Sequence, residues 1–263
     1  MKPKHILLFI SAIFAFIVLF MPVWAIFSKA FSKGIAVYIE NIMQPDTLSA
    51  IWLTMRTALI VLPINIVFGV CSAWLISKYE FRGKRVLITI IEMPFAISPI
   101  IAGLAYLMLY GNYGIIGAWL EPFGIQLMFN TTGIALISIF VTCPFIARIL
   151  IPLMTQQGSS REEASLTLGA NGFQTFMRIT LPQIKWAMLY GAILANARAM
   201  GEFGAVSVVS GLIRGETMTL PTQVQLLYLD NNTVGAFAVA TLLSLLAVIT
   251  LILRTYLEKK SKA

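Results

Sequence analysis

Apolar residues in this chain are gathered into long runs, which short polar segments separate. A helix that spans the hydrocarbon core of a bilayer needs about 20 consecutive, mostly apolar residues. Six runs meet that length, and they lie at residues 6–27, 49–77, 86–110, 132–153, 188–210 and 234–253. The pattern therefore predicts an all-α membrane protein, with one polytopic transmembrane domain over residues 1–263.

The first run needs a separate decision, because a charged N-terminus followed by an apolar core is also typical of a signal peptide. Lys2, Lys4 and His5 precede the run, and Val-Trp-Ala at residues 23–25 resembles a weak cleavage site. The apolar stretch continues to Phe27, which is longer than the roughly 7–15 residues of a signal core. We interpret it as an uncleaved first helix.

The third run contains two prolines, Pro94 and Pro99, and a serine at position 98. A proline inside a membrane helix removes a backbone hydrogen bond and kinks or breaks the helix. Two interpretations remain open. Pro94 and the pair Ser98-Pro99 mark either a discontinuous helix, whose freed backbone groups line a cavity on the translocation path, or a plain proline kink.

Composition supports the bilayer as solvent for much of this chain. Apolar residues make up 59% and charged residues 11% of it, with a mean hydropathy of +0.87. A soluble domain carries roughly 25% charged residues. The net charge of +8 does not indicate nucleic-acid binding, because the basic residues are scattered between apolar runs and form no stretch that could follow a phosphate backbone.

The distribution of lysine and arginine predicts the orientation of the spans. With both termini in the cytoplasm, fourteen of the nineteen basic residues face inward, and only Lys29, Lys33 and Arg214 face outward. Such an excess on the cytoplasmic side follows the positive-inside rule. The inward set comprises Lys2, Lys4, Lys78, Arg82, Lys84, Arg85, Arg148, Arg161, Arg178, Lys185, Arg254, Lys259, Lys260 and Lys262.

The longest cytoplasmic connection in this topology is residues 154–187. Ser160 and Glu163 fit a capping box at the start of a helix that runs to Leu168, with Gly169 as a left-handed cap. A second short helix over 172–178 is expected to end near residues 181–182. The helix pair is either a docking knob for a partner or an amphipathic loop that rests on the membrane surface, and these features do not separate the two.

The spacing within this connection resembles the EAA motif of the permeases of ATP-binding-cassette (ABC) importers. The matching residues are Glu163, Ala164, Gly169, Ile179, Leu181 and Pro182, and Ser165 stands where the motif has a second alanine. The resemblance implies the fold of a type I importer permease. It also implies that this segment is a coupling helix that seats in a groove of a separate ATPase subunit.

Further stretches, at residues 81–84, 140–148 and 196–211, resemble the W-type branch of the sulfate/thiosulfate permease family. That resemblance implies an inner-membrane importer with three kinds of partner: an ABC ATPase dimer, a second homologous permease of the T type, and a periplasmic sulfate- or thiosulfate-binding protein. Molybdate and tungstate permeases share the Arg-x-x-Gly-Glu-Phe-Gly core at 198–204, so a molybdate or tungstate permease stays an alternative.

Two charges lie deep in the fifth predicted span, Arg198 and Glu202, four residues apart on one helical face. A charge at that depth costs about 2.5–3.5 kcal/mol on the insertion scale, so it faces a polar cavity or a partner. In one interpretation Arg198 lines the translocation path for an anion and Glu202 holds its side chain. In the other the pair is structural and ties helices together.

No catalytic or metal site is expected in this chain. It has no phosphate-binding loop, its one histidine is His5, and Cys71 and Cys143 fall inside apolar runs. A dianion entering a cell with a negative interior meets a cost of roughly 4.6 kcal/mol per 100 mV. ATP and Mg²⁺ are therefore expected on the partner ATPase, with no cofactor here.

An ion-coupled carrier or channel is the competing class of protein, but it leaves the cytoplasmic motif unexplained. An intramembrane enzyme is a third class, and it would need a membrane-embedded His or Asp cluster.

Overall fold

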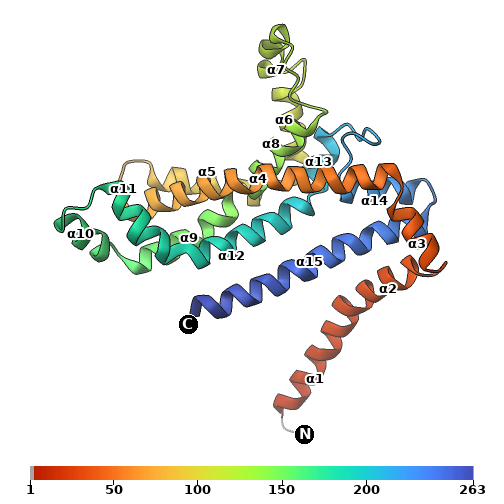
Figure 1. Ribbon diagram of the computed structural model, residues 1–263, viewed down its shortest axis with the longest axis horizontal. Coiled ribbons are helices and arrows are strands. Elements are labelled where there is room, and N and C mark those ends of the chain that lie inside the picture. The colour runs from red at the N-terminus through yellow and green to blue at the C-terminus, as the bar shows by residue number, and fades with distance from the viewer. Residues whose placement is uncertain (1–2, 263) are drawn as a thin grey trace.

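A computed structural model describes residues 3–262 as an assembly of helices, with no strand in that part of the chain. Lys2, which the charge count places in the cytoplasm, lies outside the described residues, as do the side chains of Arg254, Lys259, Lys260 and Lys262. One group of long helices runs side by side along the long axis of the molecule. A second group projects sideways from it (Figure 1).

The N-terminal half holds α1 (Pro3–Ala15), a π turn (Phe16–Phe20), α2 (Met21–Ala30), α3 (Ile35–Ile42), α4 (Pro45–Lys78), α5 (Lys84–Ala96), α6 (Pro99–Tyr110), α7 (Ile115–Leu120), a 3₁₀ turn (Glu121–Phe123) and α8 (Thr131–Thr142). The C-terminal half holds α9 (Pro144–Gln157), α10 (Ser160–Thr167), α11 (Gly172–Thr175), a π turn (Phe176–Thr180), α12 (Leu181–Met200), α13 (Gly204–Val209), α14 (Leu220–Leu229) and α15 (Thr233–Lys262).

Within the described residues, five stretches are long and apolar enough to cross a membrane. Four of them overlap predicted runs: Leu7–Ala30, Pro45–Lys78, Thr131–Gln157 and Thr233–Leu253. The fourth predicted run, 132–153, is bent, because Thr131–Gln157 consists of α8 and α9 with a turn at Cys143 before Pro144. The fifth stretch, Pro99–Phe123, differs from the predicted third run in where it begins and ends.

The prediction of one helix over 86–110 is wrong. The chain leaves the helix at Ile97, which is extended, and α6 begins at Pro99. Pro99 has no N–H to continue the ladder of α5, and its ring pushes Ser98 into the extended conformation that is observed. Pro94, in contrast, lies inside α5. The helix is therefore interrupted at Ile97–Ser98 and not merely kinked, and the role of this break in a translocation path stays a prediction.

The prediction of one helix over 188–210 is also wrong. The α12 helix begins at Leu181 and ends at Met200, and α13 begins only at Gly204. Gly201 caps the end of α12, and Glu202 lies between the two helices. Glycine is a poor helix former, so Gly201 and Gly204 on either side of a charged residue favour a break here.

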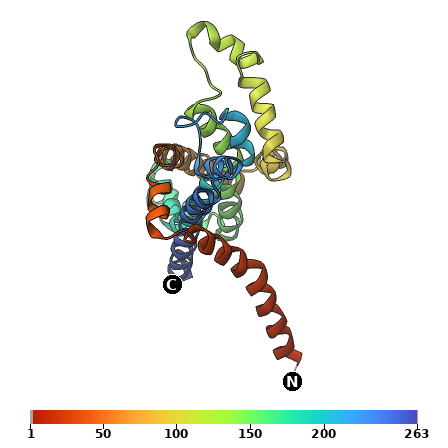
Figure 2. The ribbon, with the colours of Figure 1, turned by 90° about the vertical axis from the view of Figure 1, so that its right-hand side faces the viewer.

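Two apolar cores correspond to the two groups of helices. In the long bundle, Ile146 of α9 is fully buried between α4 and α12. A Cβ on Gly69 would lie 2.6 Å from the Cβ of Ile146, and one on Gly191 would lie 3.2 Å from its Cα, so both glycines permit close approach of the helices. A separate core joins α6, α8 and α13. The view along the bundle shows the projecting group on one side and α1 on the other (Figure 2).

Candidate functional site

The segment with the EAA-like spacing folds into α10 and α11 at one end of the long bundle, at the opposite end from α3 and α14 (Figure 1). Gly169 joins the two helices with a φ of +86°, a left-handed conformation that suits glycine. The predicted glycine corner is therefore present. The structure also places Ala164 and Glu163 on the exposed surface of α10.

The predicted capping box between Ser160 and Glu163 is not formed at the start of α10. Ser159 is the N-cap of α10 and Ser160 is its first helical residue. The Ser159 hydroxyl donates to the Glu163 carboxylate, four residues on, and makes no hydrogen bond to a backbone amide of the first turn. Ser160 cannot cap the helix because it already lies in its first turn.

The predicted second helix, 172–178, does not end near residues 181–182. It passes through the π turn Phe176–Thr180 directly into α12, so that Pro182 lies in the first turn of that helix. A π turn is a means by which a helix passes a residue that cannot supply its regular hydrogen bond. The start of α11 carries a capping box between Asn171 and Gln174, which the sequence analysis missed.

Ser165, the residue that departs from the motif, is buried between the two short helices. Its hydroxyl lies 2.7 Å from the Thr175 hydroxyl of α11 and donates to the carbonyl of Glu162 at 2.8 Å. Alanine could not make either hydrogen bond. The serine thus joins α10 to α11 directly.

A second link ties α10 to the end of α4. Nζ of Lys78, the last residue of α4, lies 2.8 Å from Glu162 Oε1 and also donates to the Gly158 carbonyl. The same Oε1 accepts a hydrogen bond from Thr180 at 3.2 Å. Burial raises the pKa of the Glu162 carboxyl, but the hydrogen bond and charge of Lys78 outweigh it, so the pKa lies below its usual range. No local sequence pattern predicts this pair, because its members are 84 positions apart.

Several large apolar side chains lie on the outer surface of the helix pair. Leu168 is 88% exposed and Phe173 is 70% exposed, and Leu166 and Met177 are exposed as well. Of the remaining motif residues, Pro182 is exposed, and Ile179 and Leu181 are half-buried. A soluble surface rarely concentrates large apolar side chains in this way unless something covers them.

Arg198 and Glu202 form the ion pair that their spacing predicts, although Glu202 lies beyond the end of α12. The Arg198 Nη1 and Glu202 Oε2 atoms are 2.5 Å apart. Glu202 Oε1 accepts a hydrogen bond at 2.9 Å from the amide of Ala205, in the first turn of α13, where free N–H groups favour an anion. The Glu202 side chain is 1% exposed and that of Arg198 is 34% exposed. The carboxylate is therefore an anchored, buried group, and the guanidinium reaches the surface.

Pro99 lies beside this pair through the start of α13. A Cβ on Gly204 would lie 3.3 Å from the Cβ of Pro99, so α6 and α13 meet closely where both helices begin. Ser98 precedes Pro99 and is exposed. Pro99 thus packs against α13 two residues beyond Glu202, and the assignment of these four residues to a translocation path stays a prediction.

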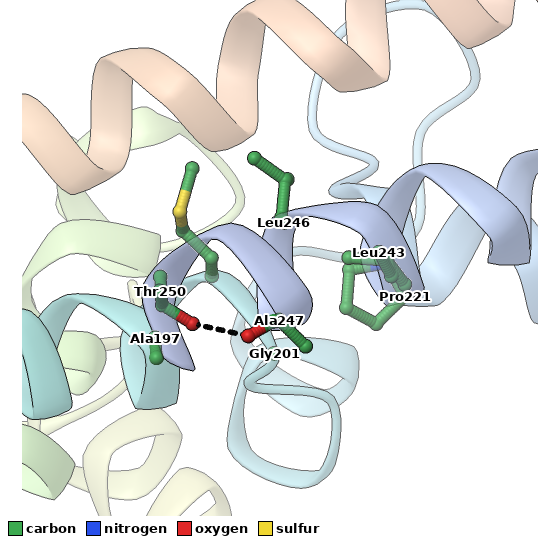
Figure 3. A pocket seen from close by; sticks show the side chains of 8 residues that line it. Ala197, Gly201, Pro221, Leu243, Leu246, Ala247 and Thr250 are labelled. Atoms are coloured by element: carbon green, nitrogen blue, oxygen red, sulfur yellow. Dashed lines mark hydrogen bonds between the residues drawn. The ribbon is translucent and has the colours of Figure 1, made fainter. Parts of the chain in front are cut away.

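An apolar cavity of about 180 Å³ lies between α12, α14 and α15 (Figure 3). One of its lining residues, Ala197, directly precedes Arg198 in the sequence. Its lining includes Ala197, Met200, Pro221 and Leu246, and the Thr250 hydroxyl that faces it is already bonded to the Ala247 carbonyl at 2.8 Å. An oxyanion needs hydrogen-bond donors or cations to replace its hydration. The lining of this cavity provides neither, so it is not a binding site for an oxyanion.

A second cavity, of about 490 Å³, lies between α5 and α9, and its lining combines the polar Thr89, Glu92 and Arg148 with Met93, Phe95 and Ala96. The Arg148 guanidinium lies over the ring of Phe95, 5.1 Å from its centre. No group of His, Cys, Asp and Glu side chains within residues 3–262 has the arrangement of a metal site.

Comparison with known proteins adds a family and a set of relatives. The profile of the binding-protein-dependent transport system inner membrane component family matches residues 65–263. The chain is 51% identical over 255 residues to the sulfate transport system permease protein CysW of Escherichia coli, covering 97% of this chain and 88% of that protein. It is 32% identical over 245 residues to the corresponding protein CysT of Synechococcus elongatus, covering 93% and 88%.

Among solved structures, a chain of a bacterial alginate ABC transporter in complex with an alginate pentasaccharide-bound periplasmic protein has a similar fold. Its TM-score is 0.81 at 16% identity, and the match covers 98% of this chain and 94% of that one. At that identity the likeness concerns the fold alone.

Proposed function

Because the chain belongs to the family of binding-protein-dependent transport system inner membrane components, we propose that it is the W-type permease of an ATP-driven importer for sulfate or thiosulfate. The higher identity to a W-type than to a T-type relative supports the W-type assignment, 51% against 32%. A molybdate or tungstate permease is the alternative that the shared Arg-x-x-Gly-Glu-Phe-Gly core leaves to experiment.

The observation that carries the coupling role is the exposed helix pair α10–α11. Its largest exposed apolar side chains, Leu168 and Phe173, lie on either side of the Gly169 corner, at the end of the bundle where Lys78 and Glu162 also lie. A groove in an ATPase subunit would cover these side chains. Glu163, Ala164, Ser165, Gly169, Ile179, Leu181 and Pro182 form or support this proposed docking knob.

In this proposal, substrate passes beside Arg198. The Arg198 guanidinium is partly exposed and forms an ion pair with the buried Glu202 carboxylate. That carboxylate also accepts a hydrogen bond from the backbone of α13, which fixes its position. A cation held at a membrane helix end lowers the barrier that a dianion meets in a low-dielectric region. Pro99 and Ser98 lie where the break between α5 and α6 meets this site.

The chain would work with an ABC ATPase dimer that binds ATP and Mg²⁺, with a T-type permease, and with a periplasmic sulfate- or thiosulfate-binding protein. The membrane is the inner membrane, as the family description states. The positive-inside pattern supports termini and the α10–α11 end on the cytoplasmic side.

Reconstitution tests the proposal. Proteoliposomes containing the chain, the ATPase and the T-type permease should accumulate labelled sulfate only when ATP is inside and the binding protein is outside. Thiosulfate should compete, and molybdate should not. Accumulation that persists without the ATPase would contradict an ABC importer. Stimulation of ATP hydrolysis by molybdate but not by sulfate would contradict the proposed substrate.

A further inference from the structure

Lys78 connects the proposed docking knob to a helix that lies outside the EAA-like motif. It ends α4, a 34-residue helix, and its side chain is only 9% exposed although it carries a charge. A lysine at a helix end is normally solvated, so a nearly buried ammonium requires partners. Lys78 has two of them on the α9–α10 side: the Gly158 carbonyl and the Glu162 carboxylate.

Glu162 is the residue next to the motif glutamate, and the two differ in what they contact. Glu163 is exposed and pairs only locally, with Ser159. Glu162 has a side chain that is 14% exposed, and its Oε1 contacts both Lys78 and the Thr180 hydroxyl. One carboxylate oxygen therefore joins three segments: the end of α4, the first turn of α10, and the π turn that leads into α12.

The α4 helix extends from this point to the other end of the molecule. Near its N-terminal end, the Thr54 hydroxyl accepts a hydrogen bond from the amide of Leu220 at the start of α14, at 2.9 Å. Between the two ends α4 packs on α8, α9 and α12. A displacement of α10 that Lys78 passes to α4 would thus reach both ends of the bundle without passing through the π turn.

We propose that the Lys78–Glu162 ion pair is a positioning element for transport, which passes motion of the ATPase-docked helix pair directly to α4. The proposal rests on the proposed function. Without the pair, α10 stays attached to the bundle through α9, through the Ser165–Thr175 hydrogen bond to α11 and through the π turn before α12. ATP would still be bound and hydrolysed, but less of the motion would reach the spans.

The test uses the complete reconstituted complex with Lys78→Met, Glu162→Gln and the charge exchange Lys78→Glu/Glu162→Lys. The measured quantity is sulfate accumulated per ATP hydrolysed. Each single variant should co-purify with the ATPase and hydrolyse ATP, with the ratio lowered about tenfold, within the usual range of coupling between distant sites. The charge exchange should raise the ratio above that of either single variant.

The matched control is Lys84→Met, which breaks the exposed Lys84–Glu80 pair at the same end of the molecule and should leave the ratio unchanged. A normal ratio in both single variants would overturn the proposal. So would a loss of ATPase co-purification that accounts for all of the lost transport, because the pair would then be structural only. In either case the unaltered complex would still transport sulfate, so a failure of the proposed function itself would be recognised separately.

Discussion

Ser165 occupies the one position at which the EAA-like segment departs from its pattern, and the structure gives the departure a physical reason. The side chain is buried, and its hydroxyl bridges α10 and α11 through Thr175. A buried hydrogen bond between two hydroxyls contributes about 1 kcal/mol net. The serine thus strengthens the helix pair and leaves its outer surface unchanged.

Ser165→Ala should therefore lower the thermal midpoint of the purified chain by about 2–4 °C, the shift that 1 kcal/mol produces at this chain length. ATPase co-purification should not change, because the hydroxyl points between the helices. Thr175→Val should have a similar effect. The double variant should lose less than the sum of the two, since both substitutions remove the same hydrogen bond. Additive losses would contradict the link between α10 and α11.

Arg198 and Glu202 allow the two interpretations of the buried charges to be separated by experiment. Arg198→Gln should reduce sulfate uptake tenfold or more, because it removes a charged hydrogen-bond donor for the anion. A hydrogen bond to a charged group contributes about 1.5–3 kcal/mol, which corresponds to a factor of ten or more. That variant alone leaves the buried Glu202 without a partner, and the resulting instability would complicate the result. The decisive variant is Arg198→Gln/Glu202→Gln, which keeps the volume and removes both charges.

If the pair only ties α12 to α13, the double variant should transport normally. If Arg198 faces the path, uptake should stay low although the thermal midpoint recovers. The control is Arg56→Gln, which removes an exposed arginine on α4 and should leave uptake unchanged.

At the scale of elements, helix existence was predictable and helix continuity was not. Runs such as 49–77 and 234–253 match observed helices because hydropathy over about 20 residues reports burial in a bilayer. The same average conceals a break, since a break depends on single residues. Pro99 has no N–H to donate to the preceding helix, which causes the first break. At the second break, Gly201 and Gly204 flank Glu202, whose carboxylate accepts a hydrogen bond from the backbone of α13. Both breaks lie in segments that remain apolar.

The close approach of α4, α9 and α12 gives the clearest prediction at this scale. A Cβ at position 69 would lie 2.6 Å from the Cβ of Ile146, nearer than real side chains come, so α4 and α9 would have to separate. Gly69→Val should lower the free energy of unfolding by about 1–3 kcal/mol, measured in detergent by chemical denaturation. Cys71→Val, two residues away on an exposed face of α4, should have little effect. Equal stability of the two variants would contradict the packing.

At the scale of the whole molecule, the sequence predicts where the EAA-like motif lies but not what it contacts. Pattern and spacing along the chain identify Gly169 as a corner and α10 as a helix, because those depend on neighbours in sequence. The Lys78–Glu162 contact depends on where the end of α4 meets the segment after α9, which no local pattern contains. The interactions that join the docking knob to the bundle are of this second kind.

The same architecture determines what the exposed surface of the knob should do. Leu168 and Phe173 are among its most exposed side chains, so Leu168→Asp/Phe173→Asp removes no core contact and should leave the thermal midpoint unchanged. If an ATPase groove covers them, two carboxylates would be buried there without partners, and the ATPase should no longer co-purify. Leu229→Asp introduces a carboxylate at an exposed leucine near the opposite end, and co-purification should persist. Retention of the ATPase by the double variant, with loss of membrane-surface contacts instead, would show that the helix pair rests on the lipid.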